Sequence, residues 1–171
     1  MKALSSFLPF HPKSCWYVSA LAALLFGLFT DHAALAQGPL TLQAIAFTDA
    51  GRLAEAEAVI KEALTGQESN DAMTWYVQGF VLKELYVADG KQPEDPRRSR
   101  AVESVQRCLR MDRTKRLEDW WRPLLFFLGE SYLADVQLEI RNLLPGQPVK
   151  AEQFFSQYSA IQEALNPGED T

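Results

Sequence analysis

The sequence of 171 residues predicts an all-α protein, in which three antiparallel helix pairs follow a separate N-terminal segment. No stretch shows the sustained alternation of β-branched and polar residues that half-buried strands require. Apolar residues instead recur at steps of three and four, as on one face of an α-helix. Breaker sequences such as "TGQESND" and "ADGKQPEDP" separate these periodic stretches, so loops are expected between the helices.

The first segment, 1–36, has the layout of a signal peptide. An uncharged apolar run at 15–30 is followed by Ala34 and Ala36, which form the small-x-small pattern of a cleavage site. We expect cleavage after Ala36 and export to the bacterial periplasm or the medium. An uncleaved membrane anchor is the less favoured alternative, because the run is shorter than the roughly 20 residues of a membrane span. The helical domain is then 37–171.

The periodic stretches of this domain predict six helices. Four have clear limits at about 39–50, 52–65, 118–142 and 148–165, and two are marked by apolar faces at 72–86 and 101–109. Ser69 or Asn70 is expected to cap the helix that follows it. The inward residues of the helix at 118–142 are expected to be Trp121, Leu125, Leu128, Tyr132 and Val136. Those of the last helix are expected to be Ala151, Phe155, Tyr158, Ile161 and Leu165.

Two glycines lie inside helical patterns and recur with the same downstream spacing. Gly79 precedes Ala101 by 22 residues, and Gly129 precedes Ala151 by the same number, with matching apolar steps beyond. A glycine inside a helix costs about 1 kcal/mol relative to alanine. We therefore expect Gly79 and Gly129 to be close-packing sites, where a side chain would separate the two helices of a pair.

These segments resemble the tetratricopeptide repeat (TPR) family. The stretches "WYVQGFVL" and "LFFLGESY" are similar to the first helix of its repeat, and "AGRLAEAEAVIKEAL" is similar to its turn and second helix. The resemblance covers most of 37–165 and implies a short TPR-like α-solenoid. Pairs two and three depart from the family pattern because each has about ten extra residues between its helices. They are expected to be elongated.

In that family the first helices line a concave groove that holds a peptide or a partner helix. The resemblance therefore implies an exported, non-catalytic adaptor or scaffold that binds another protein through an apolar groove. Counted from the glycine registers, the groove residues would be Tyr76, Phe80, Lys83, Phe126, Glu130 and Leu133. The groove could instead be covered by the N-terminal pair or by the tail of the chain.

A basic segment at 97–116 supports a second hypothesis, the binding of an anionic polymer or of lipid headgroups. Its candidate residues are Arg97, Arg98, Arg100, Arg107 and Arg110. An ordinary exposed helix, balanced by acidic residues elsewhere, would show the same composition. An enzyme that uses carboxylates alone is the third and least favoured reading.

The composition excludes several classes of site. Both histidines, His11 and His32, precede the expected cleavage site, and Cys108 is then the single remaining cysteine. Catalytic triads with histidine and zinc sites built from histidine or several thiolates are therefore excluded. No cofactor is expected, and the net charge of −5 argues against nucleic acid. Cys108 is expected in the core, and self-association is plausible because no polar capping helix follows the third pair.

Overall fold

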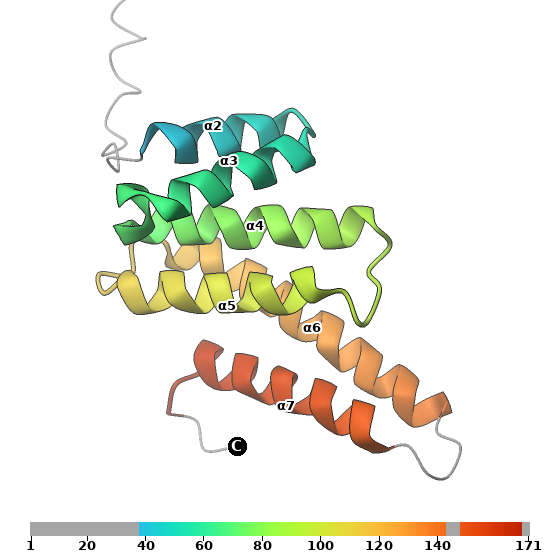
Figure 1. Cartoon of the computed structure of the whole chain (residues 1–171). Coiled ribbons are helices and arrows are strands. Elements are labelled where there is room, and N and C mark those ends of the chain that lie inside the picture. The colour runs from blue at the N-terminus through green and yellow to red at the C-terminus, as the bar shows by residue number, and fades with distance from the viewer. Residues whose placement is uncertain (1–37, 143–147, 169–171) are drawn as a thin grey trace, which may run out of the picture. The chain divides into compact units, whose positions relative to one another are not determined.

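The structure, a computed structural model, describes residues 38–142 and 148–168. The predicted signal peptide lies outside these residues. The described chain is all-helical and contains no strand, which confirms the prediction of an all-α protein. Its elements are α2 (Pro39–Asp49), α3 (Leu53–Thr65), the short 3₁₀ helix η1 (Gln67–Asn70), α4 (Ala72–Ala88), α5 (Pro96–Met111), α6 (Glu118–Asn142) and α7 (Pro148–Leu165) (Figure 1).

Aspartates begin two of the helices. The side chain of Asp71 accepts a hydrogen bond from the amide of Met73 at the start of α4, and Asp95 accepts one from the amide of Arg97 at the start of α5. Such caps satisfy amides that have no partner inside the helix. The expectation that Ser69 or Asn70 caps α4 was wrong. Both residues belong to η1, which delays the start of α4 until Asp71.

Glycines end α2 and α4 in the same way. Gly51 has a φ of 71° and Gly90 a φ of 82°, the left-handed conformation that glycine adopts without a steric penalty. The next amide then donates back to the helix, from Arg52 to the carbonyl of Phe47 and from Lys91 to that of Tyr86. This is the Schellman arrangement, and it stops each helix at a defined residue.

The start of α2 is held by a residue from a later element. Glu68 of η1 accepts hydrogen bonds from the amides of Leu40 and Thr41, at 3.1 and 2.8 Å, and from the Thr41 hydroxyl at 2.7 Å. The same hydroxyl lies 2.8 Å from that of Thr74 on α4. A side chain at Gly38 would clash with the Glu68 carboxylate, whose carbon would lie 1.9 Å from the added Cβ. Gly38 therefore allows this external cap to form.

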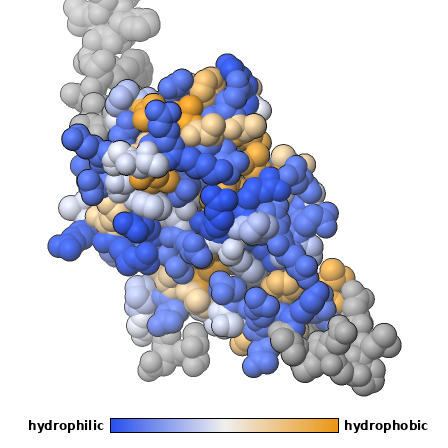
Figure 2. Space-filling view, in the orientation of Figure 1, coloured by the Kyte–Doolittle hydropathy of each residue, from blue (hydrophilic) through white to orange (hydrophobic). Residues whose placement is uncertain are grey.

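Helices that follow one another in the sequence pack most extensively, namely α2 with α3, α4 with α5, and α6 with α7 (Figure 1). Further contacts join α3 to α4 and α5 to α6. The central helix is α4, which also contacts α2 and α6. On the face seen in Figure 2 hydrophilic residues predominate, and the hydrophobic ones form separate patches rather than one continuous area.

The contacts of α4 with α6 show that these helices run in the same direction. Tyr76 meets Trp120, and one to two turns further along both helices Lys83 meets Phe127. The α2 residue Thr41 pairs with Thr74 near the start of both helices, while residues near the end of α2 lie beside Val77 and Phe80. Three helices, α2, α4 and α6, are thus aligned in parallel.

The core follows the predicted face of α6, and on α7 it includes the predicted Ala151, Ile161 and Leu165 but not Phe155. The five predicted inward residues of α6 are all buried: Trp121, Leu125, Leu128, Tyr132 and Val136. On α7, Phe154 is buried, whereas Phe155 is 54% exposed. Neighbouring residues point about 100° apart around a helix. The buried stripe of α7 passes through Phe154 and Ile161, so the expectation for Phe155 was wrong.

Gly79 and Gly129 both lie at close helix contacts, but the residues that they meet on the following helix do not correspond in the sequence repeat. A Cβ at Gly79 would lie 2.7 Å from Val105 Cγ2 and 3.2 Å from the Ala101 carbonyl oxygen. At Gly129 the nearest atom would be Ile161 Cγ2 at 3.0 Å. Gly129 therefore meets Ile161 rather than the stretch from Ala151 that the sequence correspondence suggested. The repeat in the sequence does not extend to the packing of α7.

Candidate binding groove

A cavity of about 200 Å³ lies where α2, α4 and α6 meet. We call it the aromatic groove and define it by its lining residues, Ile45, Thr48 and Asp49 of α2, Tyr76, Val77 and Phe80 of α4, and Trp120 of α6. The parallel alignment of the three helices places these residues together, although α2 and α6 are far apart in the sequence.

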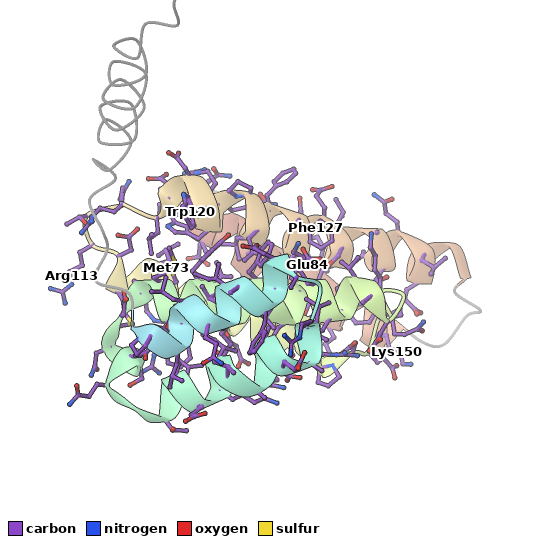
Figure 3. The ribbon with its side chains drawn as sticks, turned by 90° about the horizontal axis from the view of Figure 1, so that it is seen from above. Met73, Glu84, Arg113, Trp120, Phe127 and Lys150 are labelled. Atoms are coloured by element: carbon purple, nitrogen blue, oxygen red, sulfur yellow. The ribbon has the colours of Figure 1, made fainter. Side chains whose placement is uncertain are left out.

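Three aromatic rings dominate the aromatic groove. The Tyr76 and Trp120 rings meet edge to face, with centroids 5.6 Å apart, and the Tyr76 and Phe80 rings stack at 6.1 Å. Such pairs contribute roughly 0.5–1.5 kcal/mol beyond the area that they bury. Trp120 is nevertheless 50% exposed, so half of its surface remains available to a ligand. In Figure 3, Trp120 and Phe127 lie along α6 beside α2 and α4.

The loop before α6 fixes the position of Trp120. The buried Asp112 accepts hydrogen bonds from the amides of Arg116 and Leu117, at 3.0 and 2.7 Å. The amide of Trp120 in turn donates to the Leu117 carbonyl at 3.0 Å. Because this chain of bonds starts at the end of α5, the Trp120 ring is held on a defined turn rather than on a loose loop.

The polar groups of the aromatic groove are few. Asp49 is its one charged lining residue, and it forms no ion pair with any residue that the structure describes. The Thr48 hydroxyl donates to the Ala44 carbonyl at 2.8 Å and is thereby engaged within α2. Burial raises the pKa of Tyr76 and so keeps its hydroxyl neutral. The groove can therefore offer apolar contact, aromatic faces and one carboxylate.

The structure brings together only part of the set predicted from the sequence. Tyr76 and Phe80 lie in the aromatic groove, and Lys83 lies next to it, with its amino group 4.4 Å from the centre of the Phe80 ring. On α6, however, Lys83 approaches Phe127 rather than Phe126, which is 54% exposed. Glu130 is also exposed and Leu133 is half-buried; neither lines the aromatic groove.

Trp120 is the main groove residue that sequence reasoning missed. The residue that stands at the same distance before Gly79 as Trp120 does before Gly129 is Asn70. Asn70 precedes α4, so groove positions transferred from the second helix pair to the third cannot include Trp120. The seven-residue spacing between Trp120 and Phe127 was the available signal, because residues seven apart lie on the same face of a helix.

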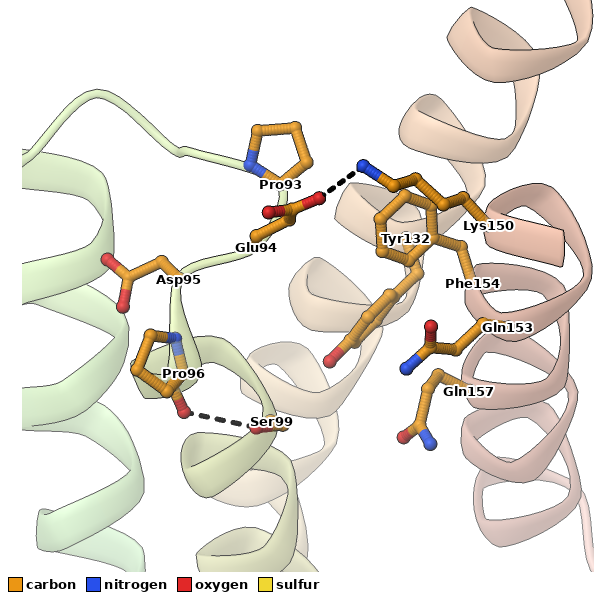
Figure 4. Close-up of a pocket in the computed structure, with 10 residues that line it drawn as sticks. All are labelled: Pro93, Glu94, Asp95, Pro96, Ser99, Tyr132, Lys150, Gln153, Phe154 and Gln157. Carbon is orange, nitrogen blue, oxygen red and sulfur yellow. Dashed lines mark hydrogen bonds and ion pairs between the residues drawn. The ribbon is translucent and has the colours of Figure 1, made fainter. Parts of the chain in front are cut away.

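A second cavity, of about 300 Å³, lies between the start of α5 and α7 (Figure 4). Glu94 and Lys150 form an ion pair of 2.5 Å at this cavity, Asp95 is held by Arg97, and the Ser99 hydroxyl donates to the Pro96 carbonyl at 3.1 Å. The charged groups of this cavity are therefore paired with one another or with Arg97, while the side chains of Gln153 and Gln157 also line it.

The five arginines of the alternative site do not form one exposed patch. Arg98 is 1% exposed, pairs with Asp135 and donates to the Ser131 carbonyl at 3.1 Å, so its inclusion in a surface site was wrong. Arg98 lies between Arg97 and Ser99 in a polar run of the sequence, and it becomes buried because α6 supplies partners for its charge. The other four differ among themselves: Arg97 pairs with Asp89 and Asp95, Arg107 stacks on Trp75 at 4.4 Å, Arg100 approaches Glu57, and Arg110 is exposed.

No protein-family model matches the chain, and no curated protein and no solved structure matches it significantly. Within 38–142 and 148–168, no three acidic, cysteine or histidine side chains are grouped so that they could hold a metal ion. None of the helices described is long and apolar enough to cross a membrane. The fold and the site together define an all-helical chain with an aromatic groove on three parallel helices.

Proposed function

We propose that this chain is a non-catalytic, TPR-like adaptor that binds a polypeptide segment of another protein in the aromatic groove. The observation that carries the proposal is the half-exposed Trp120, fixed against Tyr76 at the side of a cavity that α2, α4 and α6 line together. Rigid, partly exposed aromatic residues beside a preformed cavity are the usual anchors of protein recognition.

The order of the helix contacts supports the TPR-like part of the proposal. In this interpretation α2–α3, α4–α5 and α6–α7 are three stacked antiparallel pairs, and the second and third are elongated. The first helices of successive pairs then run in parallel along one face, and the contacts of Tyr76 with Trp120 and of Lys83 with Phe127 support this arrangement. That face is where a solenoid of helix pairs presents its binding surface.

We further propose that the adaptor acts outside the cytoplasm, after removal of 1–36. Sequencing of the N-terminus of the protein isolated from an exporting host should begin at Gln37. A chain that retains Met1 and fractionates with membranes would instead support the uncleaved anchor.

Selection of peptides from a random displayed library on the full chain tests binding in the groove. Peptides bound there should lose roughly thirtyfold in affinity for the Trp120→Ala variant, since a central anchor contributes about 2 kcal/mol or more. Phe126→Ala is the matched control, because this exposed aromatic residue of α6 does not line the aromatic groove. It should leave affinity within about twofold.

Two results would contradict the proposal. Selected peptides that bind the folded Trp120→Ala variant undiminished would exclude the aromatic groove. If Arg107→Glu/Arg110→Glu abolished binding, and the affinity of the unchanged protein fell steeply with salt, the anionic-partner hypothesis would replace it.

A further inference from the structure

We propose that the aromatic groove receives a positively charged side chain, specifically the guanidinium of an arginine on the bound polypeptide. This inference rests on the proposed function, and it names the chemistry of the anchor that the groove accepts. It is argued from three features of the aromatic groove: its free carboxylate, its aromatic rings, and the cations that the chain already places on neighbouring rings.

The charge of the groove favours a cation. Asp49 is the one charged lining residue, and it has no ion-pair partner among the residues described. A guanidinium entering the cavity would gain a charge-assisted hydrogen bond to this carboxylate, whereas an acidic side chain would be repelled. Lys83, whose amino group lies over the groove ring of Phe80, is paired with the adjacent Glu84, which reduces its repulsion of an incoming charge.

The aromatic rings favour the same ligand. A cation within about 6 Å of an aromatic centroid is attracted by the negative face of the ring, and tryptophan gives the strongest attraction. The Tyr76 and Trp120 centroids are 5.6 Å apart at an interplanar angle of 68°, so they form two walls of a corner beside the cavity. A planar guanidinium can stack on one ring while its edge donates to Asp49, which a compact lysine ammonium cannot do equally well.

Two of the three groove rings, those of Tyr76 and Trp120, differ from the rings around them in lacking a cation of their own. Lys83 covers Phe80 at 4.4 Å, Arg107 covers Trp75 at 4.4 Å, and Arg52 covers Phe47 at 4.5 Å. Among the residues described, no such partner occurs for Tyr76 or Trp120. These two residues and Asp49 line the same cavity, so the three groups form an incomplete cation site that a partner's arginine would complete.

NMR titration of the full chain tests this inference. The probes are N-acetyl-arginine methylamide, its uncharged isostere N-acetyl-citrulline methylamide, and N-acetyl-norleucine methylamide. The reporter is the indole N–H resonance of Trp120, assigned by its loss in Trp120→Phe. The arginine probe should shift this resonance saturably and bind at least about fivefold more tightly than either uncharged probe.

Two variants test whether the carboxylate of Asp49 is the charge that binds the arginine probe. Asp49→Asn should weaken the arginine probe about fivefold and leave the citrulline probe unchanged. Glu103→Gln, which removes one negative charge from the exposed side of α5, should leave both unchanged. Equal binding of arginine and citrulline, preference for norleucine, no effect of Asp49→Asn, or no shift with any probe would overturn the inference.

The library experiment distinguishes failure of the arginine inference from failure of the proposed function. If library peptides require Trp120 but carry an apolar anchor, the aromatic groove remains the binding site and only the arginine inference fails. If the peptides do not require Trp120, the proposed function fails as well.

Discussion

Arg98 of α5 forms an ion pair with Asp135 of α6, and its guanidinium carbon lies 3.8 Å from the centre of the Tyr132 ring. The arginine is 1% exposed, so its charge is almost fully removed from water. Such burial is tolerated only when the charge is paired and hydrogen-bonded. Arg98 therefore joins α5 to α6 through a contact that depends on all its partners.

Arg98→Ala should lower the free energy of unfolding by roughly 3–5 kcal/mol, the usual effect of breaking a buried ion pair. Asp135→Asn should act in the same direction. Arg110→Ala is the matched control on the same helix; its exposed side chain should change stability by less than about 0.5 kcal/mol. Chemical denaturation measures all three. Equal stability of the Arg98 and Arg110 variants would show that the buried pair contributes nothing.

Gly79→Ala should be destabilising although alanine is the better helix former. The added Cβ would lie 2.7 Å from Val105 Cγ2, and the β-branched Val105 is fully buried and cannot easily move aside. We expect a net loss of about 1–2 kcal/mol, because overpacking outweighs the gain in helix propensity. Gly129→Ala, with 3.0 Å to Ile161 Cγ2, should cost less.

The double variant Gly79→Ala/Val105→Ala identifies the cause. If the Cβ of residue 79 clashes with Val105, the two substitutions together should cost less than the sum of their separate effects. Simple additivity in thermal or urea unfolding would mean that the glycine is not required by this contact.

Glu68→Gln should remove part of the cap on α2 and change the dependence of stability on pH. Burial alone would raise the pKa of Glu68, but hydrogen bonds from Thr41 and Leu40 outweigh it, and the net pKa is lowered. The unfolded chain then binds more protons than the folded one below about pH 4.3, the ordinary pKa of glutamate. The stabilisation by the ionised carboxylate is complete above that pH and is lost as the pH falls.

Unfolding measured at pH 7 should show Glu68→Gln to be less stable by about 1 kcal/mol. The difference from the unchanged protein should shrink between about pH 5 and pH 3. Glu62→Gln, an exposed change on α3, is the control. A constant difference across this range would show that the ionised form of Glu68 is not what stabilises α2.

Cys108 should be unreactive in the folded protein. It is fully buried, and burial together with nearby Asp112 raises the pKa of its thiol to about 12. Because the thiolate is the reactive form, a disulfide reagent at pH 8 should modify it only after α5 opens. An exposed control thiol, Ser159→Cys in a Cys108→Ala background, should react within the mixing time. Comparable rates for the two thiols would contradict the burial of Cys108.

The helices could be predicted closely because their ends depend on local chemistry. Pro39, Gly51, Gly90 and Pro96 act on neighbouring residues and mark their limits in any fold. The buried face of α6 was also predicted, because its apolar residues recur at steps of three and four from Trp121 to Val136. On α7 the prediction failed at two adjacent aromatic residues, because periodicity cannot decide whether Phe154 or Phe155 faces inward. The packing of α6 decides it.

The site was less predictable because it depends on contacts between distant residues. From the sequence alone, Arg98 is expected to be a surface charge. The structure places Asp135, which is 37 residues away in the sequence, beside it. No residue of α4 corresponds to Trp120 when the second and third helix pairs are aligned on their glycines, so this alignment could not identify Trp120. Tyr76 and Phe80 were identified because they lie near Gly79, the residue from which the groove positions were counted.

Arg98 also bears on how such a chain can evolve. Helices here contact mainly their neighbours in the sequence, so a gene of this kind could in principle lose or gain a terminal helix pair by a single deletion or duplication. A deletion after α5 would, however, remove Asp135, Ser131 and Tyr132 together, and would leave Arg98 with Tyr86 and the Pro93 carbonyl as its remaining partners. A shorter descendant that lost α6 and α7 would therefore expose to water a guanidinium that the present chain buries, and would lose the ion pair that joins α5 to its neighbour.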